Sequence, residues 1–113
     1  MLVVTERAGD RVTAALPEDV SLFTVPGLRA VGDRIIDEGC RHLTLDASHT
    51  QDLDSTGITA LVTWYRRLED LGGTLAVIEV SDHHHRLLTR LGLHTALAVS
   101  PRTGPAGPSR PAN

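Results

Sequence analysis

The fold is decided by one stretch, Asp46-Ala47-Ser48-His49-Thr50-Gln51-Asp52-Leu53-Asp54-Ser55-Thr56-Gly57. Residues 42–46, just before its loop, alternate like a half-buried strand, with Leu43 and Leu45 facing the same side. Beyond it, from about Thr56 to Leu71, apolar side chains follow the i, i+3, i+4, i+7 spacing of an amphipathic helix. The stretch is therefore predicted to be a polar loop that leads from a strand into a helix.

Two hydroxyls, those of Ser55 and Thr56, are predicted in the first turn of that helix. Backbone N–H groups are unpaired there and the helix dipole is positive, so the place suits a phosphoryl group. Gly57 has no side chain, which would let a large group approach the backbone. A simpler interpretation is that Ser55 is only the N-cap of the helix, because serine is a common capping residue.

Further elements are predicted before this stretch. Residues 2–6 and 12–16 are short β-branched runs separated by Ala8-Gly9-Asp10, a pattern that predicts a hairpin. From Thr24 the apolar spacing becomes helical, and Gly39 is expected to end that helix as its C-cap.

Three more elements are predicted after it. Residues 74–80 are almost wholly apolar, which is typical of a strand buried on both faces. Asp82 is expected to cap a third helix that turns Leu87, Leu88 and Leu91 inward, and residues 96–99 suit an edge strand. The resulting order, β-β-α-β-α-β-α-β, predicts an α/β fold in which a mixed sheet of four to five strands packs against about three to four helices.

Length and composition indicate one globular domain. The chain has 113 residues, of which 41% are hydrophobic and 22% charged, enough to form one core. Residues 100–113 hold four of the six prolines and no large apolar residue. We therefore expect a domain over residues 1–99 and a disordered Pro/Gly-rich tail over residues 100–113.

Charge and hydropathy exclude several classes of protein. The net charge is −3, so no basic field attracts nucleic acid. No uncharged run is longer than that at residues 55–65, which is far shorter than the ~20 residues of a membrane span. A single cysteine, Cys40, is expected to be a small buried residue and allows no internal disulfide. These features predict a cytoplasmic protein that contacts neither nucleic acid nor a membrane.

The central stretch, together with its flanking segments, resembles the STAS domain of the anti-sigma factor antagonists. The resemblance covers roughly residues 2–99 and rests on the order and spacing of six segments. They are Leu22-Phe23-Thr24-Val25-Pro26-Gly27-Leu28-Arg29, Leu43-Thr44-Leu45-Asp46, Asp54-Ser55-Thr56-Gly57-Ile58-Thr59-Ala60-Leu61-Val62, Gly72-Gly73-Thr74-Leu75, Arg86-Leu87-Leu88 and Leu91-Gly92-Leu93.

The resemblance implies a phosphorylation-switched binding protein that is not an enzyme. The serine after the aspartate is the family's phosphorylation site, here Ser55. The unmodified protein binds an anti-sigma factor that is also a serine kinase, a GHKL-type ATPase, and thereby frees a sigma factor. Phosphorylation releases the partner, and a serine phosphatase resets the cycle. The implied partner-binding residues are Asp54, Thr56, Gly57, Asp52 and Ser21, and no cofactor or small-molecule ligand is expected.

One segment departs from the family pattern. The family shows Gly-Glu-x-Asp before the first helix, whereas this chain has Glu18-Asp19-Val20-Ser21, so Glu18 and Ser21 replace the glycine and the aspartate. The departure leaves an alternative open: a STAS-like accessory subunit of a membrane transporter or lipid-transport ATPase without a phosphorylation cycle.

Other conspicuous residues are given structural interpretations. His83-His84-His85 would point in three directions on a helix, so we expect a solvated first turn and no metal site. The Gly-x-Ser-x-Gly elbow of a serine hydrolase is absent around Ser55, so no catalytic residue is predicted. Tyr65 belongs to the predicted inward stripe of its helix, and Trp64 is expected to lie off it as an exposed contact residue.

Overall fold

The computed structural model describes residues 1–102, and residues 103–113 of the predicted tail lie outside the described residues. The elements run in the order β1 (Val3–Ala8), β2 (Arg11–Ala15), β3 (Asp19–Val20), α1 (Val25–Asp37), β4 (His42–Asp46), β5 (Asp52–Leu53), α2 (Ser55–Asp70), β6 (Thr74–Val80), α3 (Asp82–Arg90) and β7 (Val99–Pro101). The predicted α/β class is confirmed.

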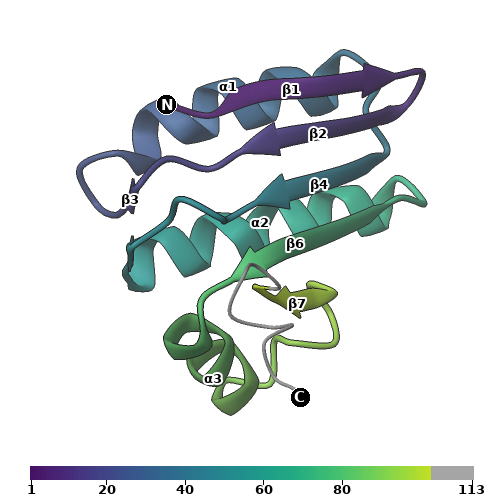
Figure 1. Cartoon of the computed structure of the whole chain (residues 1–113). Helices are drawn as coiled ribbons and strands as arrows, with labels where there is room; N and C mark the ends of the chain where they lie inside the picture. Colours follow the sequence, from purple (N-terminus) through teal and green to yellow (C-terminus); the bar gives the residue numbers. More distant parts are fainter. Residues whose placement is uncertain (103–113) are drawn as a thin grey trace, which may run out of the picture.

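Five strands form the main sheet in the order β1-β2-β4-β6-β7 (Figure 1). The β1–β2 hairpin is antiparallel, and the pairs β2–β4, β4–β6 and β6–β7 are parallel. A separate two-stranded parallel pair, β3–β5, was not predicted, because two residues per strand are too few to show a period in the sequence.

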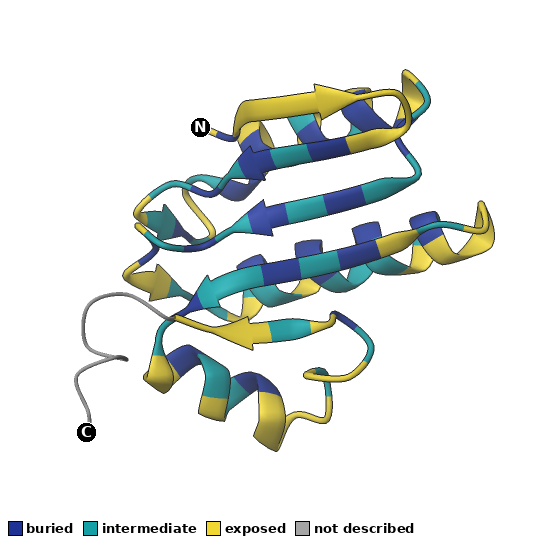
Figure 2. Cartoon of the chain, turned by 45° about the vertical axis from the view of Figure 1, so that its right-hand side comes forward, coloured by how far each residue is buried: buried dark blue, intermediate teal, exposed yellow. Residues whose placement is uncertain are grey.

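The sheet is covered on one face. Helices α1 and α2 lie on the same side of it, and α3 lies beside β7 (Figure 1). Along β2, β4 and β6, buried residues alternate with half-buried ones (Figure 2). The prediction that residues 74–80 are buried on both faces is therefore wrong: Leu75, Val77 and Val80 enter the core, while within residues 1–102 no helix covers the opposite face.

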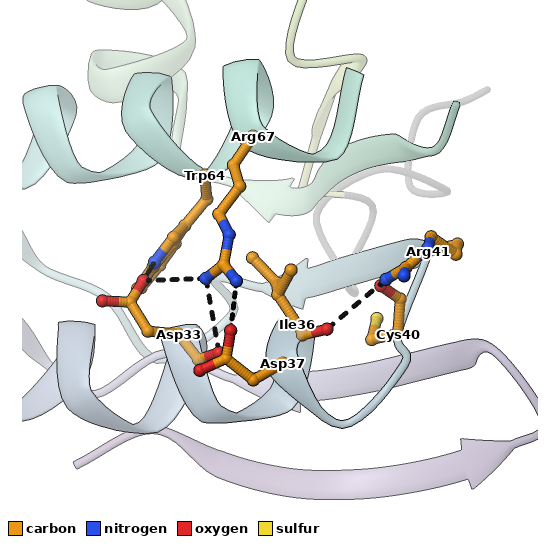
Figure 3. A network of polar contacts seen from close by, with 7 residues as sticks. All are labelled: Asp33, Ile36, Asp37, Cys40, Arg41, Trp64 and Arg67. Atoms are coloured by element: carbon orange, nitrogen blue, oxygen red, sulfur yellow. Dashed lines mark hydrogen bonds and ion pairs between the residues drawn. The ribbon is translucent and has the colours of Figure 1, made fainter. Parts of the chain in front are cut away.

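Helices α1 and α2 meet at a tryptophan. Trp64 is only 1% exposed and packs on Gly32, and its Nε1 donates a hydrogen bond to Asp33 Oδ1 at 3.1 Å. Arg67 on the same helix forms ion pairs with Asp33 and Asp37 of α1 (Figure 3). The prediction of an exposed Trp64 is wrong, because the missing side chain of Gly32 leaves room for the indole between the helices.

Helix α3 differs from its prediction in three details. Its N-cap is Ser81, whose Oγ accepts a hydrogen bond from the His84 amide, and Asp82 is the first helical residue. His84 is buried, so only part of the histidine run is solvated. Leu91 follows the helix and is exposed, because the helix ends before it can turn inward.

The described chain continues past the predicted end of the domain. Strand β7 reaches Pro101, and the Arg102 amide donates a hydrogen bond to the Val80 carbonyl at 2.8 Å. Residues 100–102 thus belong to the fold, although the sequence placed them in the tail. None of the helices in residues 1–102 is both long and apolar enough to cross a membrane.

Candidate functional site

The β3–β5 pair holds the segment before α1 next to the segment before α2. The amides of Gln51 and Asp52 donate to the Glu18 carbonyl at 2.8 and 3.1 Å, and the Asp54 amide donates to the Val20 carbonyl at 3.2 Å. The segment before α1 is thereby joined to the segment before α2. This pairing brings Ser21 and Ser55, which are distant in the sequence, to the same edge of the molecule.

Asp54 is the N-cap of α2. Its Oδ1 accepts a hydrogen bond from the Gly57 amide at 2.9 Å, and its Oδ2 accepts one from the Leu22 amide at 3.0 Å. The Gly57 and Leu22 amides, in that order of effect, lower the pKa of the Asp54 carboxyl. Asp54 is therefore an anionic structural residue that also ties the β3–α1 loop to α2.

Ser55 is the first residue of α2 and is exposed. Within residues 1–102, no hydrogen bond engages its Oγ, although its carbonyl accepts one from Thr59 Oγ1 at 2.8 Å. The interpretation of Ser55 as only an N-cap is thus excluded, because Asp54 fills that position. The hydroxyl is free for chemistry at the positive end of a helix of 16 residues.

Gly57 has a packing role. It is buried, and a Cβ built on it would lie 2.6 Å from the Val20 carbonyl oxygen and 2.8 Å from Val20 Cγ1. The glycine lets α2 approach β3 closely and offers no surface for a partner. The expectation that a large group approaches the backbone at Gly57 is wrong, because Val20 occupies that space.

Ser21 anchors the loop before α1. Its Oγ donates a hydrogen bond to Asp19 Oδ2 at 3.1 Å and accepts one from the Phe23 amide at 3.3 Å. This loop presents two apolar side chains to solvent, Leu22 at 62% and Phe23 at 87% exposure. Sequence reasoning missed them as surface residues because they adjoin the apolar pattern of α1.

Acidic side chains lie on the two paired segments that lead to Ser55. Asp52 is exposed on β5 and pairs in register with Asp19 on β3, and Asp54 precedes Ser55 in the sequence. Thr56, the second predicted hydroxyl, is half-buried. The β3–β5 pair and the start of α2 therefore present the Ser55 hydroxyl together with the carboxylates of Asp19, Asp52 and Asp54.

An arginine near the end of the described chain holds the loop that leads to this edge. One Arg102 guanidinium nitrogen lies 2.9 Å from the Ala47 carbonyl oxygen and 3.5 Å from that of Thr50. Its Nε donates to the Glu79 carbonyl at 3.1 Å, where Glu79 has a positive φ of 58°. Thr50 is buried and donates from Oγ1 to the Pro17 carbonyl at 2.9 Å. Sequence reasoning missed Arg102 because its neighbours have the composition of a tail.

Two other candidates of the sequence concern metal binding and the cysteine. Among residues 1–102, no group of three or more His, Cys, Asp or Glu side chains is placed to hold a metal ion. Cys40 is buried, as predicted, and burial raises the pKa of its thiol.

These features define an α/β domain that presents a serine at the N-terminus of a helix, beside an acidic and apolar loop. A family model described as Mlab, STAS domain, matches residues 3–99. The chain therefore belongs to the STAS domain family.

One curated relative is similar over part of the chain. The chain is 32% identical over 60 residues to the anti-sigma F factor antagonist of Paenibacillus polymyxa, a match that covers 53% of the chain and 51% of that protein. The match thus spans about half the length of the relative.

Solved structures share the fold at low sequence identity. An anti-sigma factor antagonist from Mycobacterium paratuberculosis superposes with a TM-score of 0.78 at 20% identity, over 89% of this chain and 85% of that one. SpoIIAA in its unphosphorylated form gives a TM-score of 0.76 at 17% identity, over 88% and 87% of the two chains. The Bacillus cell fate determinant SpoIIAA in the phosphorylated form gives 0.72 at 16% identity, over 97% and 100%.

Proposed function

We propose that this protein is an anti-sigma factor antagonist whose Ser55 accepts a phosphoryl group. The observation that carries the proposal is that two different residues fill the two roles at the start of α2. Asp54 caps the helix and leaves the Ser55 hydroxyl exposed and without a hydrogen bond in residues 1–102. The relatives described as anti-sigma factor antagonists support the same assignment.

The unphosphorylated protein binds an anti-sigma factor serine kinase in the cytoplasm and frees a sigma factor. Its binding surface consists of Ser55, Asp52 and the loop that exposes Leu22 and Phe23. Apolar and aromatic side chains that are exposed beside polar groups are typical of interface centres. The Asp54–Leu22 hydrogen bond at 3.0 Å keeps this loop next to the phosphoacceptor.

Phosphorylation releases the partner by local charge. A phosphoryl group adds about −1.5 to −2 charges, next to Asp54 and near Asp52 and Asp19. Because the Ser55 hydroxyl has no hydrogen bond in the described chain to lose, the modification requires no refolding. The positive end of α2 stabilises the phosphate where it stands, and a serine phosphatase restores the binding form.

The test is capture of partners from lysate by the immobilised full-length protein. The baits are wild type, Ser55→Ala, Ser55→Asp and Thr89→Asp, the last placing the same added charge at an exposed hydroxyl on α3. We expect a GHKL-type ATPase with wild type, Ser55→Ala and Thr89→Asp, and its loss with Ser55→Asp. Added ATP should then yield phosphoserine at residue 55 by mass spectrometry. Equal capture of the ATPase by Ser55→Asp, or phosphorylation elsewhere, contradicts the proposal.

A second candidate function is a STAS-like accessory subunit of a membrane transporter or lipid-transport ATPase. The matching family model is described as Mlab and not as an antagonist, and Glu18 and Ser21 replace two residues of the antagonist pattern. In that case all four baits would capture the same transporter subunit, and ATP would leave Ser55 unmodified.

A further inference from the structure

Within residues 1–102, the face of the sheet opposite α1 and α2, here called the open face, contains a hollow of about 210 Å³. Its walls come from β1, β2 and β4, and include Glu6, Arg11, Thr13, His42 and Thr44. Arg11 and His42 begin β2 and β4, whereas Ser55 follows the opposite end of β4. The hollow is therefore separate from the phosphoacceptor edge.

The strand register places the polar side chains on one face. Glu6 is paired with Thr13, and Thr13 with Thr44, across β1, β2 and β4. Arg11 is paired with His42, one step along the same face. Residues two apart on a strand point to the same side, so these five side chains converge above the sheet.

Most of these groups have no partner within the described chain. In residues 1–102, no ion pair or side-chain hydrogen bond is formed by Glu6 or Arg11, although both line the same hollow. The hydroxyls of Thr13 and Thr44 are equally free in that part of the chain. The Glu6 carboxylate can therefore pair with a positive group of a ligand, and the Arg11 guanidinium can pair with a negative group.

His42 is held in place beside them. Its Nδ1 lies 2.9 Å from Thr74 Oγ1, and its Nε2 lies 4.0 Å from Asp10 Oδ2. The contact with Thr74 holds the imidazole ring at the wall of the hollow, and the strand register places it next to Arg11. Arg11 and His42 thus line the hollow from two neighbouring strands, and the carboxylate of Glu6 lines it from a third.

We propose that this hollow binds a small zwitterion, an α-amino acid, on the open face of the sheet. The ligand carboxylate pairs with Arg11 and accepts from the threonine hydroxyls, and its ammonium group pairs with Glu6. A simple anion would be opposed by Glu6, and a simple amine by Arg11. The volume suits a molecule of amino-acid size and lies below the ~300–1,000 Å³ of pockets for drug-sized ligands. This site departs from the expectation that the protein has no small-molecule ligand.

The test is a titration of the isotope-labelled full-length protein with single amino acids, followed by two-dimensional NMR. We expect at least one amino acid to bind with a Kd below about 10 mM and to shift the amides of β1, β2 and β4. Binding should weaken about tenfold or more in both Glu6→Gln and Arg11→Gln. Arg29→Gln, which removes an exposed arginine on α1, should bind as wild type does.

Matched ligands separate a zwitterion site from a single-charge site. Propionate and ethylamine each carry one of the two charges and should bind about tenfold or more weakly than the amino acid. The proposal is refuted if no amino acid saturates the shifts, if propionate binds equally well, or if neither Glu6→Gln nor Arg11→Gln weakens binding. The spectra of the variants without ligand report whether they fold, so a folding defect is not mistaken for lost binding.

Discussion

The contact between Gly32 and Trp64 predicts opposite effects for the same substitution at two places on one helix. A Cβ at residue 32 would lie 2.4 Å from Trp64 Cζ2 and 2.5 Å from Cε2. This is about 1 Å closer than the ~3.5 Å of ordinary carbon contact. At Gly27, also on α1, a Cβ would meet nothing within 4 Å. Gly32→Ala is therefore expected to destabilise the protein, and Gly27→Ala to leave it unchanged or stabilise it.

The difference in the free energy of unfolding between Gly27→Ala and Gly32→Ala measures the cost of packing a methyl group against Trp64. Replacing glycine by alanine in a helix gains up to ~1 kcal/mol, and this gain is common to both variants. Overpacking a filled core typically costs ~1–3 kcal/mol. Trp64 is fully buried and its ring nitrogen is hydrogen-bonded to Asp33, so the ring cannot simply turn away. The free energies of unfolding should thus differ by about 1–3 kcal/mol.

The assay is urea unfolding followed by far-UV circular dichroism, with thermal melting as a second measurement. Unchanged m-values with a lower midpoint for Gly32→Ala would report lost stability. A domain of this size should show a gap in Tm of at least about 4 °C. If the two variants unfold with free energies within about 0.5 kcal/mol of each other, the indole does not fill the space at Gly32 and the reasoning fails.

Two further predictions concern pH. Backbone donors lower the pKa of Asp54 in the folded state, so its contribution to stability is present at neutral pH and is lost as the pH falls through that lowered pKa. The Tm of wild type should exceed that of Asp54→Asn at about pH 7, and this difference in Tm should shrink towards about pH 3. A difference in Tm that does not depend on pH would contradict the role of Asp54 as an ionised N-cap. Burial, followed by the charge of His83, lowers the pKa of His84, so folding favours the neutral ring and stability is lost as the pH falls below the ordinary histidine range. Between about pH 7 and 5 the Tm should fall less in His84→Gln than in wild type, and an equal fall in both proteins would contradict this role.

Helices and strands could be predicted from the sequence where a local residue pattern is typical of one kind of element only. The helices and the strand at residues 42–46 were predicted from their apolar periods, the strand at residues 74–80 from its apolar run, and the hairpin from two β-branched runs around a glycine turn. In the inward stripe predicted for α2, Leu61 and Leu68 are buried as expected, but the positions at Ile58 and Tyr65 are off by one or two. Ile58 and Tyr65 only pack against the core, whereas Ala60 and Trp64 are fully buried. That choice depends on Gly32, a residue on another helix, and the pattern of α2 alone does not contain it.

The start of the helix at Ser55 or Thr56 was predicted correctly, but the residue that caps it was not. Asp54 and Ser55 are both good capping residues, so the sequence could not assign the cap. The choice depends partly on the Leu22 amide, which the Asp54 carboxylate reaches across 32 positions of sequence. Gly57 was interpreted as an open approach for the same reason, since only the fold places Val20 against it.

The arginine that follows β7 relates the site to the order in which the chain is made. Strands β1, β2, β4 and β6 precede it in the sequence, so a growing chain can pair them before Arg102 has been added. The loop from Ala47 to Thr50 acquires its last hydrogen bonds only afterwards, from a residue 55 positions downstream of Ala47. The edge that bears Ser55 is thus completed only after Arg102 has been added, and a shorter nascent chain offers a partner an unfinished surface.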